Sequence, residues 1–223
     1  MHSHGNDIRS GQDANKFDIR LVCISDIHGA IGFHVPDGDI LIIAGDVCAY
    51  GKISELKVFD EFLSSLPHQL KILVAGNHDW PFADPSGPEA KDLVRNAVYL
   101  QDTGFEFYGM KFWGSPWQPW FFNWAFNLPR GPKLAEVWSK IPDDTDVLIT
   151  HSPPFGILDK VGGDNVGCED LANALKHVRP KVHVFGHIHE GYGTEELDGT
   201  IYVNASLNNG YYRLVNEPIV IDI

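Results

Sequence analysis

The chain has 223 residues, of which 43% are hydrophobic and 21% charged, so it is long enough to enclose a substantial core within one α/β domain. Acidic residues outnumber basic ones by 30 to 17, giving a formal charge of -13, and a surface of that sign repels long polyanions. We therefore expect no bulk DNA or RNA as a partner. We also expect no membrane association, because the longest apolar runs are far shorter than a bilayer is thick.

Residues 1–16 are polar and show no periodicity, which predicts a flexible N-terminal tail, and residues 17–223 predict a single domain without linkers or repeats. The three cysteines, Cys23, Cys48 and Cys168, form no C-x-x-C pair. We interpret them as buried free thiols, which favours a reducing, cytoplasmic location.

The predicted elements alternate between strands and helices along the chain. Short continuous apolar runs predict strands buried on both faces, apolar spacing of three and four predicts helices, and apolar runs interrupted by glycine predict hairpins. In chain order these are strands 19–24 and 39–44, helix 53–66 capped by Ser54, strand 71–75, hairpin 105–113, helix 132–141, strand 146–150, helix 168–178, strand 181–185 and hairpin 192–203. This alternation predicts a largely parallel central sheet, within an α/β fold in which a two-sheet mixed β-sandwich is flanked by helices.

Side chains that bind metals follow each of the five predicted buried strands. They are Asp26 and His28, Asp46, then Asn77 with His78 and Asp79, His151, and finally His187 and His189. Ligands bind at the carboxyl ends of the strands in open α/β sheets, and imidazole and carboxylate are the usual ligands of first-row divalent metals. The sequence therefore predicts a metal site at this edge of the fold.

The local spacing supports that prediction. In Asp26-Ile27-His28 and His187-Ile188-His189, two side chains that leave an extended segment two residues apart point the same way. Glycine precedes Asp46, Asn77 and His187, which allows the backbone to turn sharply beside an ion. A single histidine at a strand end is usually an ordinary polar residue, but the complete ordered set indicates a metal centre.

The series Asp-x-His, Gly-Asp, Gly-Asn-His-Asp, His and Gly-His-x-His resembles the calcineurin-like metallophosphoesterase superfamily. The segments 115–120, 127–131, 183–193 and 204–206 resemble those of the metallophosphoesterase-domain-containing (MPPED) class III phosphodiesterases. This resemblance extends from about residue 19 to the C-terminus. It implies a hydrolase for small phosphodiesters such as cyclic nucleotides. It also implies two divalent metal ions, for which Mn, Fe and Zn all suit the ligands and Mn is favoured.

The resemblance also implies a role for each matching residue. The first ion would be bound by Asp26, His28, Asp46 and His189, and the second by Asp46, Asn77, His151 and His187. Asp46 would bridge the two ions, and hydrolysis would proceed by direct attack of metal-bound hydroxide. His78, which follows the ligand Asn77, would protonate the leaving oxygen or stabilise the developing charge, and Asp79 would orient His78.

Substrate contacts are expected from Asn77 and His78, with Trp117 and Arg130 as further candidates. The aromatic segment 113–126 is a possible stacking wall, although core packing explains most of it. A phosphomonoesterase of broad specificity and a non-catalytic metal-binding scaffold remain alternatives. No arginine follows Gly45-Asp46 closely, which counts against a protein phosphatase. The sequence leaves the oligomeric state open.

Overall fold

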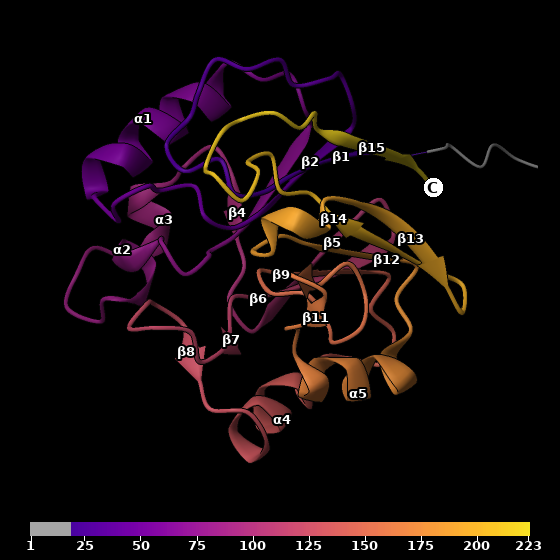
Figure 1. Cartoon of the computed structure of the whole chain (residues 1–223). Helices are drawn as coiled ribbons and strands as arrows, with labels where there is room; N and C mark the ends of the chain where they lie inside the picture. Colours follow the sequence, from indigo (N-terminus) through magenta and orange to yellow (C-terminus); the bar gives the residue numbers. More distant parts are fainter. Residues whose placement is uncertain (1–18) are drawn as a thin grey trace, which may run out of the picture.

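Two β-sheets pack face to face, and helices cover the outer face of each sheet (Figure 1). The computed structural model describes residues 19–223, so the predicted tail over residues 1–16 lies outside the described residues. The two main sheets and the flanking helices confirm the predicted α/β two-sheet sandwich.

The first sheet has five strands in the order β15-β1-β2-β3-β4. Its strands are β1 (Arg20–Ile24), β2 (Ile40–Ala44), β3 (Leu70–Val74), β4 (Val98–Tyr99) and β15 (Ile219–Asp222). Strands β1 to β4 are parallel, whereas β15 pairs with β1 in the antiparallel sense. The first three predicted strands thus lie side by side, and their carboxyl ends meet at one edge.

The second sheet has six strands in the order β13-β14-β12-β9-β6-β5. They are β5 (Thr103–Phe107), β6 (Met110–Ser115), β9 (Val147–Thr150), β12 (Val182–Phe185), β13 (Gly193–Leu197) and β14 (Thr200–Asn204). The four central strands are parallel, and the antiparallel pairs β5–β6 and β13–β14 confirm both predicted hairpins. The two remaining predicted strands, β9 and β12, are neighbours here.

Helices and short strands complete the structure. The helices are α1 (Ile53–Ser64), α2 (Trp80–Ala83), α3 (Ala90–Leu93), α4 (Pro132–Trp138), α5 (Glu169–Val178) and the 3-10 turn η1 (His189–Gly191). The short strands pair as β7 (Gln118–Pro119) with β8 (Asn127–Leu128), and β10 (Lys160–Val161) with β11 (Asp164–Asn165). Across residues 19–223, no helix is both long and apolar enough to cross a bilayer.

The predicted cap of α1 is wrong. The helix begins at Ile53, so Ser54 lies inside its first turn. Glu55 forms the capping interaction instead. Its carboxylate accepts the backbone N–H groups of Lys52 (2.8 Å) and Ala49 (2.9 Å), just before the helix begins.

Both faces of the central strands of each sheet are buried. Cys23 and Ile42 of the first sheet meet Val147 and Val184 of the second in the central layer of the core. The outer face of the first sheet packs on α1, and that of the second sheet packs on α4 and α5. This double burial explains why β2, β9 and β12 consist almost entirely of apolar residues. The three cysteines are buried and free, as expected.

His183 is a buried neutral histidine in β12. Its Nε2 lies 2.9 Å from the Thr150 hydroxyl, which itself donates to Ser152 O, so the imidazole Nε2–H must be the donor. The Nδ1 atom has no hydrogen-bond partner in the described part of the chain. Burial lowers the pKa of His183 from 6.5 to about 3.

This burial should make stability depend on pH. The folded-state pKa of His183 is depressed, so its contribution is complete above pH 6.5 and is lost as the pH falls toward about 3. His183→Gln retains a donor for Thr150 but cannot titrate. From about pH 7 to about pH 5 the metal-free variant should lose about 2 kcal/mol less unfolding free energy than the wild type. Urea unfolding in a chelator measures this difference, and equal losses would contradict the assignment.

Candidate metal centre

The metal-binding side chains predicted from the sequence meet at one edge of the sandwich. They follow β1, β2 and β3 of the first sheet and β9 and β12 of the second. Three groups each bring one potential ligand atom per residue within 4.8 Å of the others, and these groups are Asp26–His28–His189, Asp46–His151–His187 and His28–Asp46–His78. Asn77 adjoins the second group, with its Oδ1 2.9 Å from His151 Nε2. The structure therefore brings all seven predicted ligands together.

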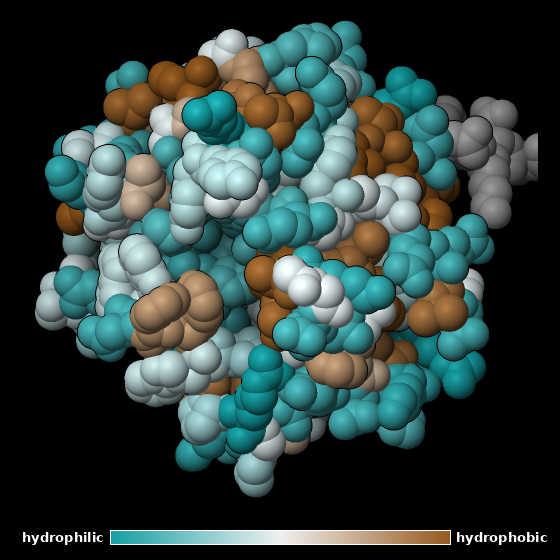
Figure 2. Space-filling model, in the orientation of Figure 1, coloured by the Kyte–Doolittle hydropathy of each residue, from teal (hydrophilic) through white to brown (hydrophobic). Residues whose placement is uncertain are grey.

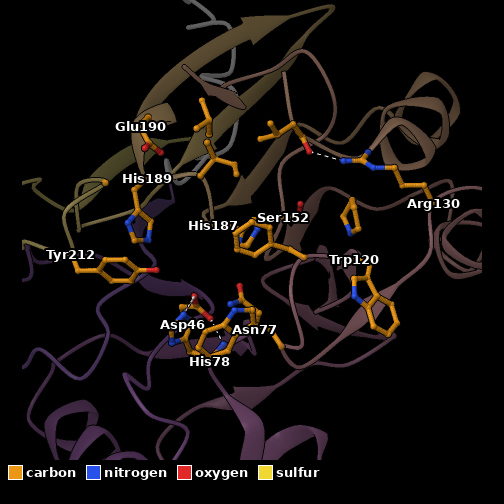
Figure 3. Close-up of a pocket in the computed structure, with 17 residues that line it drawn as sticks. Asp46, Asn77, His78, Trp120, Arg130, Ser152, His187, His189, Glu190 and Tyr212 are labelled. Atoms are coloured by element: carbon orange, nitrogen blue, oxygen red, sulfur yellow. Dashed lines mark hydrogen bonds and ion pairs between the residues drawn. The ribbon is translucent and has the colours of Figure 1, made fainter. Parts of the chain in front are cut away.

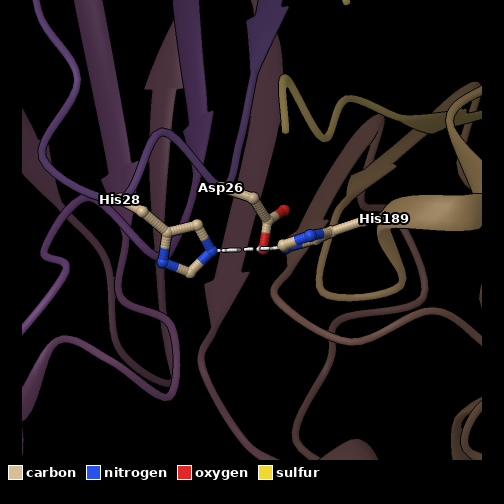
Figure 4. A group of neighbouring side chains, drawn as sticks. All are labelled: Asp26, His28 and His189. Atoms are coloured by element: carbon tan, nitrogen blue, oxygen red, sulfur yellow. Dashed lines mark hydrogen bonds and ion pairs between the residues drawn. The ribbon is translucent and has the colours of Figure 1, made fainter. Parts of the chain in front are cut away.

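In the first group, two imidazole nitrogens and a carboxylate oxygen, each able to bind a cation, face one another. His28 and His189 approach the Asp26 carboxylate (Figure 4), with His189 Nε2 3.3 Å from Asp26 Oδ1 and 3.2 Å from His28 Nε2. His189 donates its Nδ1–H to Asn209 O at 2.9 Å, so the Nε2 of the neutral ring carries a lone pair. Asp26 Oδ1 is buried and has no hydrogen-bond partner within residues 19–223. A cation at this point would satisfy all three atoms.

The second group shows the same arrangement. His151 donates its Nδ1–H to Ala44 O at 2.9 Å, so its Nε2 faces two acceptors, Asn77 Oδ1 at 2.9 Å and Asp46 Oδ1 at 3.5 Å. Burial alone would lower the pKa of His151, but the Asp46 carboxylate raises it to about 9. In the metal-free protein, a proton on His151 thus supplies the positive charge that these acceptors need.

The Asp46 carboxylate lies between the two groups. Its Oδ1 faces His151 and accepts the backbone N–H of His78 at 2.8 Å, while its Oδ2 lies 3.8 Å from His28 Nε2. Burial would raise the pKa of Asp46, but the neighbouring His151 lowers it to about 2. This carboxylate is therefore ionised and presents one oxygen to each group.

Glycine is required where the loops cross. A Cβ atom on Gly76 would lie 2.2 Å from Asp46 Oδ1, and one on Gly186 would lie 2.1 Å from Asp26 Oδ2. Both contacts are far inside van der Waals distance, so any larger residue would displace a carboxylate of the site. The close approach predicted from the glycines is confirmed at these two positions.

Four predicted ligands adopt the left-handed backbone conformation, which is strained for residues other than glycine. The φ angles are 51° for Asp26, 43° for His28, 52° for Asp46 and 66° for His187. Such strain concentrates at functional sites, because the surrounding structure must impose it. The fold thus holds these side chains toward a common centre.

His78 faces the cavity with a fixed ring. It donates its Nδ1–H to Ala49 O at 3.0 Å, which leaves Nε2 directed toward Asp46 Oδ2 at 4.0 Å. Its ring stacks on Trp124, with centroids 4.1 Å apart and planes at 25°. The Ala49 carbonyl and Trp124 therefore set the tautomer and orientation of His78.

The expected orientation of His78 by Asp79 is wrong. The Asp79 carboxylate turns away from the imidazole and accepts three backbone N–H groups, from Gly76 (2.8 Å), Cys48 (2.8 Å) and Val47 (3.3 Å). Burial and the nearby Asp46 raise the pKa of Asp79 to about 6. Asp79 therefore ties the loop after β2 to the loop after β3, which carry Asp46 and Asn77.

A cavity of about 460 Å³ opens beside these residues. Figure 2 shows it as a hydrophilic hollow in the molecular surface, and Figure 3 shows Asp46, Asn77, His78, His187 and His189 around it. Four aromatic residues, Trp120, Phe121, Trp124 and Tyr212, line another part of its wall. Tyr212 was missed by the sequence reasoning, because it lies in no motif that pointed to the site.

Of the two further residues expected to contact the substrate, Arg130 lines the cavity and Trp117 does not. Trp117 does not line the cavity, since its indole N–H donates to Asp102 Oδ2 at 2.8 Å and its ring packs against Phe126. Arg130 does line the cavity, but its guanidinium donates to Gly167 O at 2.7 Å and Val166 O at 2.8 Å and pairs with Glu169. Neither side chain is poised over the metal-binding groups.

Comparison with known proteins agrees with this geometry. Residues 19–191 match the calcineurin-like phosphoesterase family, so the chain belongs to that family. The chain is 46% identical over 230 residues to metallophosphoesterase domain-containing protein 1 of Homo sapiens and of Mus musculus, across 92% of this chain and 71% of each relative. This likeness confirms the MPPED resemblance seen in the motifs.

A solved structure supports the fold. Phosphopantetheinyl hydrolase (PptH) from Mycobacterium tuberculosis superposes with a TM-score of 0.55 at 18% identity, over 87% of this chain and 91% of that chain. Family membership and the clustered histidines and aspartates together define a metal-dependent phosphoesterase.

Proposed function

We propose that this chain hydrolyses small phosphodiesters, with cyclic nucleotides as candidate substrates, and that it uses two divalent metal ions. Asp26, His28, Asp46 and His189 would bind one ion, and Asp46, Asn77, His151 and His187 the other. The observation that carries this proposal is the placement of Asp46, whose two oxygens face the two groups separately. When bound, such ions polarise water and the phosphoryl oxygens.

The residues around the ions would position the ester and move a proton. His78 Nδ1 is committed to Ala49 O, so Nε2 is the atom from which a protonated His78 would donate to the leaving oxygen. Asn77 lies beside His151 and also lines the cavity. Its side-chain oxygen faces His151, so its amide N–H group can donate a hydrogen bond to a phosphoryl oxygen.

The cavity favours a small substrate with a flat apolar group. Its volume of about 460 Å³ suits a nucleotide-sized molecule, and Trp120, Phe121 and Trp124 offer aromatic surface for stacking. The formal charge of -13 disfavours a long nucleic acid. Among the lining residues the one basic side chain that is not a histidine, Arg130, is already paired with Glu169.

A metal-reconstituted assay tests the proposal. We expect protein loaded with Mn to hydrolyse bis-p-nitrophenyl phosphate and 2′,3′- or 3′,5′-cyclic nucleotides at least about tenfold faster than p-nitrophenyl phosphate. Parallel loading with Fe and Zn identifies the preferred ion. Faster hydrolysis of the monoester than of the diesters would show that the protein is a phosphomonoesterase. Binding of two ions without hydrolysis of any ester would show that it is a non-catalytic metal-binding scaffold.

A further inference from the structure

Tyr212 lies directly over the metal-binding histidines. Its ring meets His28 edge-on at 4.9 Å and His189 edge-on at 5.1 Å between centroids. Figure 3 shows its hydroxyl pointing into the cavity, between His189 and Asp46. No described residue forms a hydrogen bond with this hydroxyl, which leaves a neutral donor directed at the place where an ester would bind.

The surrounding loop is built to hold this orientation. Asn209 O accepts both the backbone N–H of Tyr212 at 2.8 Å and the Nδ1–H of His189 at 2.9 Å. The Asn209 side chain accepts the backbone N–H groups of Tyr211 at 3.0 Å and Arg213 at 3.2 Å. One residue thus links the Tyr212 backbone to a metal-binding imidazole and closes the turn that carries the tyrosine.

Two further features fix this turn against the site. Asn208 donates its side-chain N–H to Asp26 O at 2.8 Å, and Tyr212 adopts a φ of 56°, which is strained for a bulky side chain. A Cβ on Gly210 would lie 2.6 Å from Glu190 Oε1, so the turn packs closely on η1. An exposed tyrosine that served only to cover the surface would need none of these constraints.

From this geometry we infer that Tyr212 contacts the substrate, donating its hydroxyl proton in a hydrogen bond to a non-bridging phosphoryl oxygen. The inference deepens the proposed function and rests on it for the identity of the ester. Charge accumulates on the non-bridging oxygens during phosphoryl transfer, and fixed donors aimed at them stabilise the transition state. Arg130 is held by Glu169, so a neutral hydroxyl fills a role that a free cation would otherwise take. No covalent bond to Tyr212 forms or breaks.

Adjacent tyrosines provide a matched pair of variants. Tyr212→Phe removes only the hydroxyl and keeps the ring against His28 and His189, whereas Tyr211, 85% exposed, does not line the cavity. In Mn-loaded protein, Tyr212→Phe should lower kcat for bis-p-nitrophenyl phosphate by about 10- to 100-fold. It should also weaken the binding of inorganic phosphate, measured by calorimetry, by about tenfold. Tyr211→Phe should match the wild type in both measurements.

Metal analysis separates contact with the substrate from support of the histidines. Tyr212→Phe should retain the metal content of the wild type, and loss of an ion would overturn the inference. Phosphate affinity and kcat within about twofold of the wild type would overturn it as well. A wild-type protein that hydrolyses no ester would refute the proposed function, while phosphate binding to the Mn-loaded proteins would still test Tyr212 on its own.

Discussion

Asp46→Asn should abolish the uptake of both metal ions and lower phosphodiester hydrolysis by at least about a thousandfold. The substitution keeps the size of the side chain but removes the negative charge that Asp46 presents to both groups. Asn can offer one neutral oxygen, which cannot replace an anionic oxygen at each ion. Mass spectrometric metal analysis, expressed per chain, and turnover of bis-p-nitrophenyl phosphate measure the two effects.

A second buried aspartate provides the control. Asp159 is fully buried outside the metal-binding groups, where it accepts the backbone N–H groups of Gly156 and Gly167. Asp159→Asn should retain both ions. In a chelator, Asp46→Asn should unfold at a lower urea concentration than the wild type, because the substitution removes the charge partner of His151. Loss of a single ion from Asp46→Asn would show that this carboxylate is no bridge.

His78→Ala is expected to retain both metals and to lower kcat by about 100- to 10,000-fold for an ester with a poor leaving group. His78 Nε2 faces the cavity while Nδ1 is held by Ala49 O, the geometry required of a proton donor. A p-nitrophenolate leaving group departs without a proton, so the loss should be much smaller for bis-p-nitrophenyl phosphate than for a cyclic nucleotide. Parallel assays of these two substrates reveal the difference.

The exposed His177 in α5 serves as the reference for a histidine substitution. His177→Ala should behave as the wild type. Equal losses on both substrates would argue against proton donation by His78. Loss of metal from His78→Ala would make His78 a ligand, as its grouping with His28 and Asp46 allows.

The strands could be predicted because burial on both faces leaves a simple trace in the sequence. Residues 19–24, 39–44 and 71–75 are apolar except for Arg20, Asp39 and Lys71 at or near their starts, and the structure places them in β1, β2 and β3 with shifts of only a residue at either end. The cap of α1 was predicted wrongly, because the sequence alone does not show that the preceding loop brings the Ala49 and Lys52 N–H groups to the Glu55 carboxylate. The roles of Ser54 and Glu55 depend on the path of the loop that precedes the helix.

The predicted metal ligands could be placed together because they follow parallel strands, whose ends must converge. The contacts of Asp79 and Trp117 could not be predicted in this way. Their side-chain directions depend on loops folded against distant segments, so Asp79 meets the turn after β2 and Trp117 meets Asp102. Tyr212 lies more than 180 positions after His28 in the sequence, and only the folded C-terminal turn reveals their proximity.

The left-handed conformations of Asp26, His28, Asp46 and His187 link the lifetime of this protein to its metal supply. Each such residue destabilises the fold by about 1 kcal/mol or more, and burial beside Asp46 raises the pKa of Asp79 in the metal-free site, which adds a further cost at neutral pH. An ion that binds only the folded chain raises the free energy of unfolding, and this stabilisation grows with the logarithm of the ion concentration. Newly synthesised chains in an ion-starved cell would therefore unfold more often and be degraded sooner, so the amount of the protein would follow the availability of the ion.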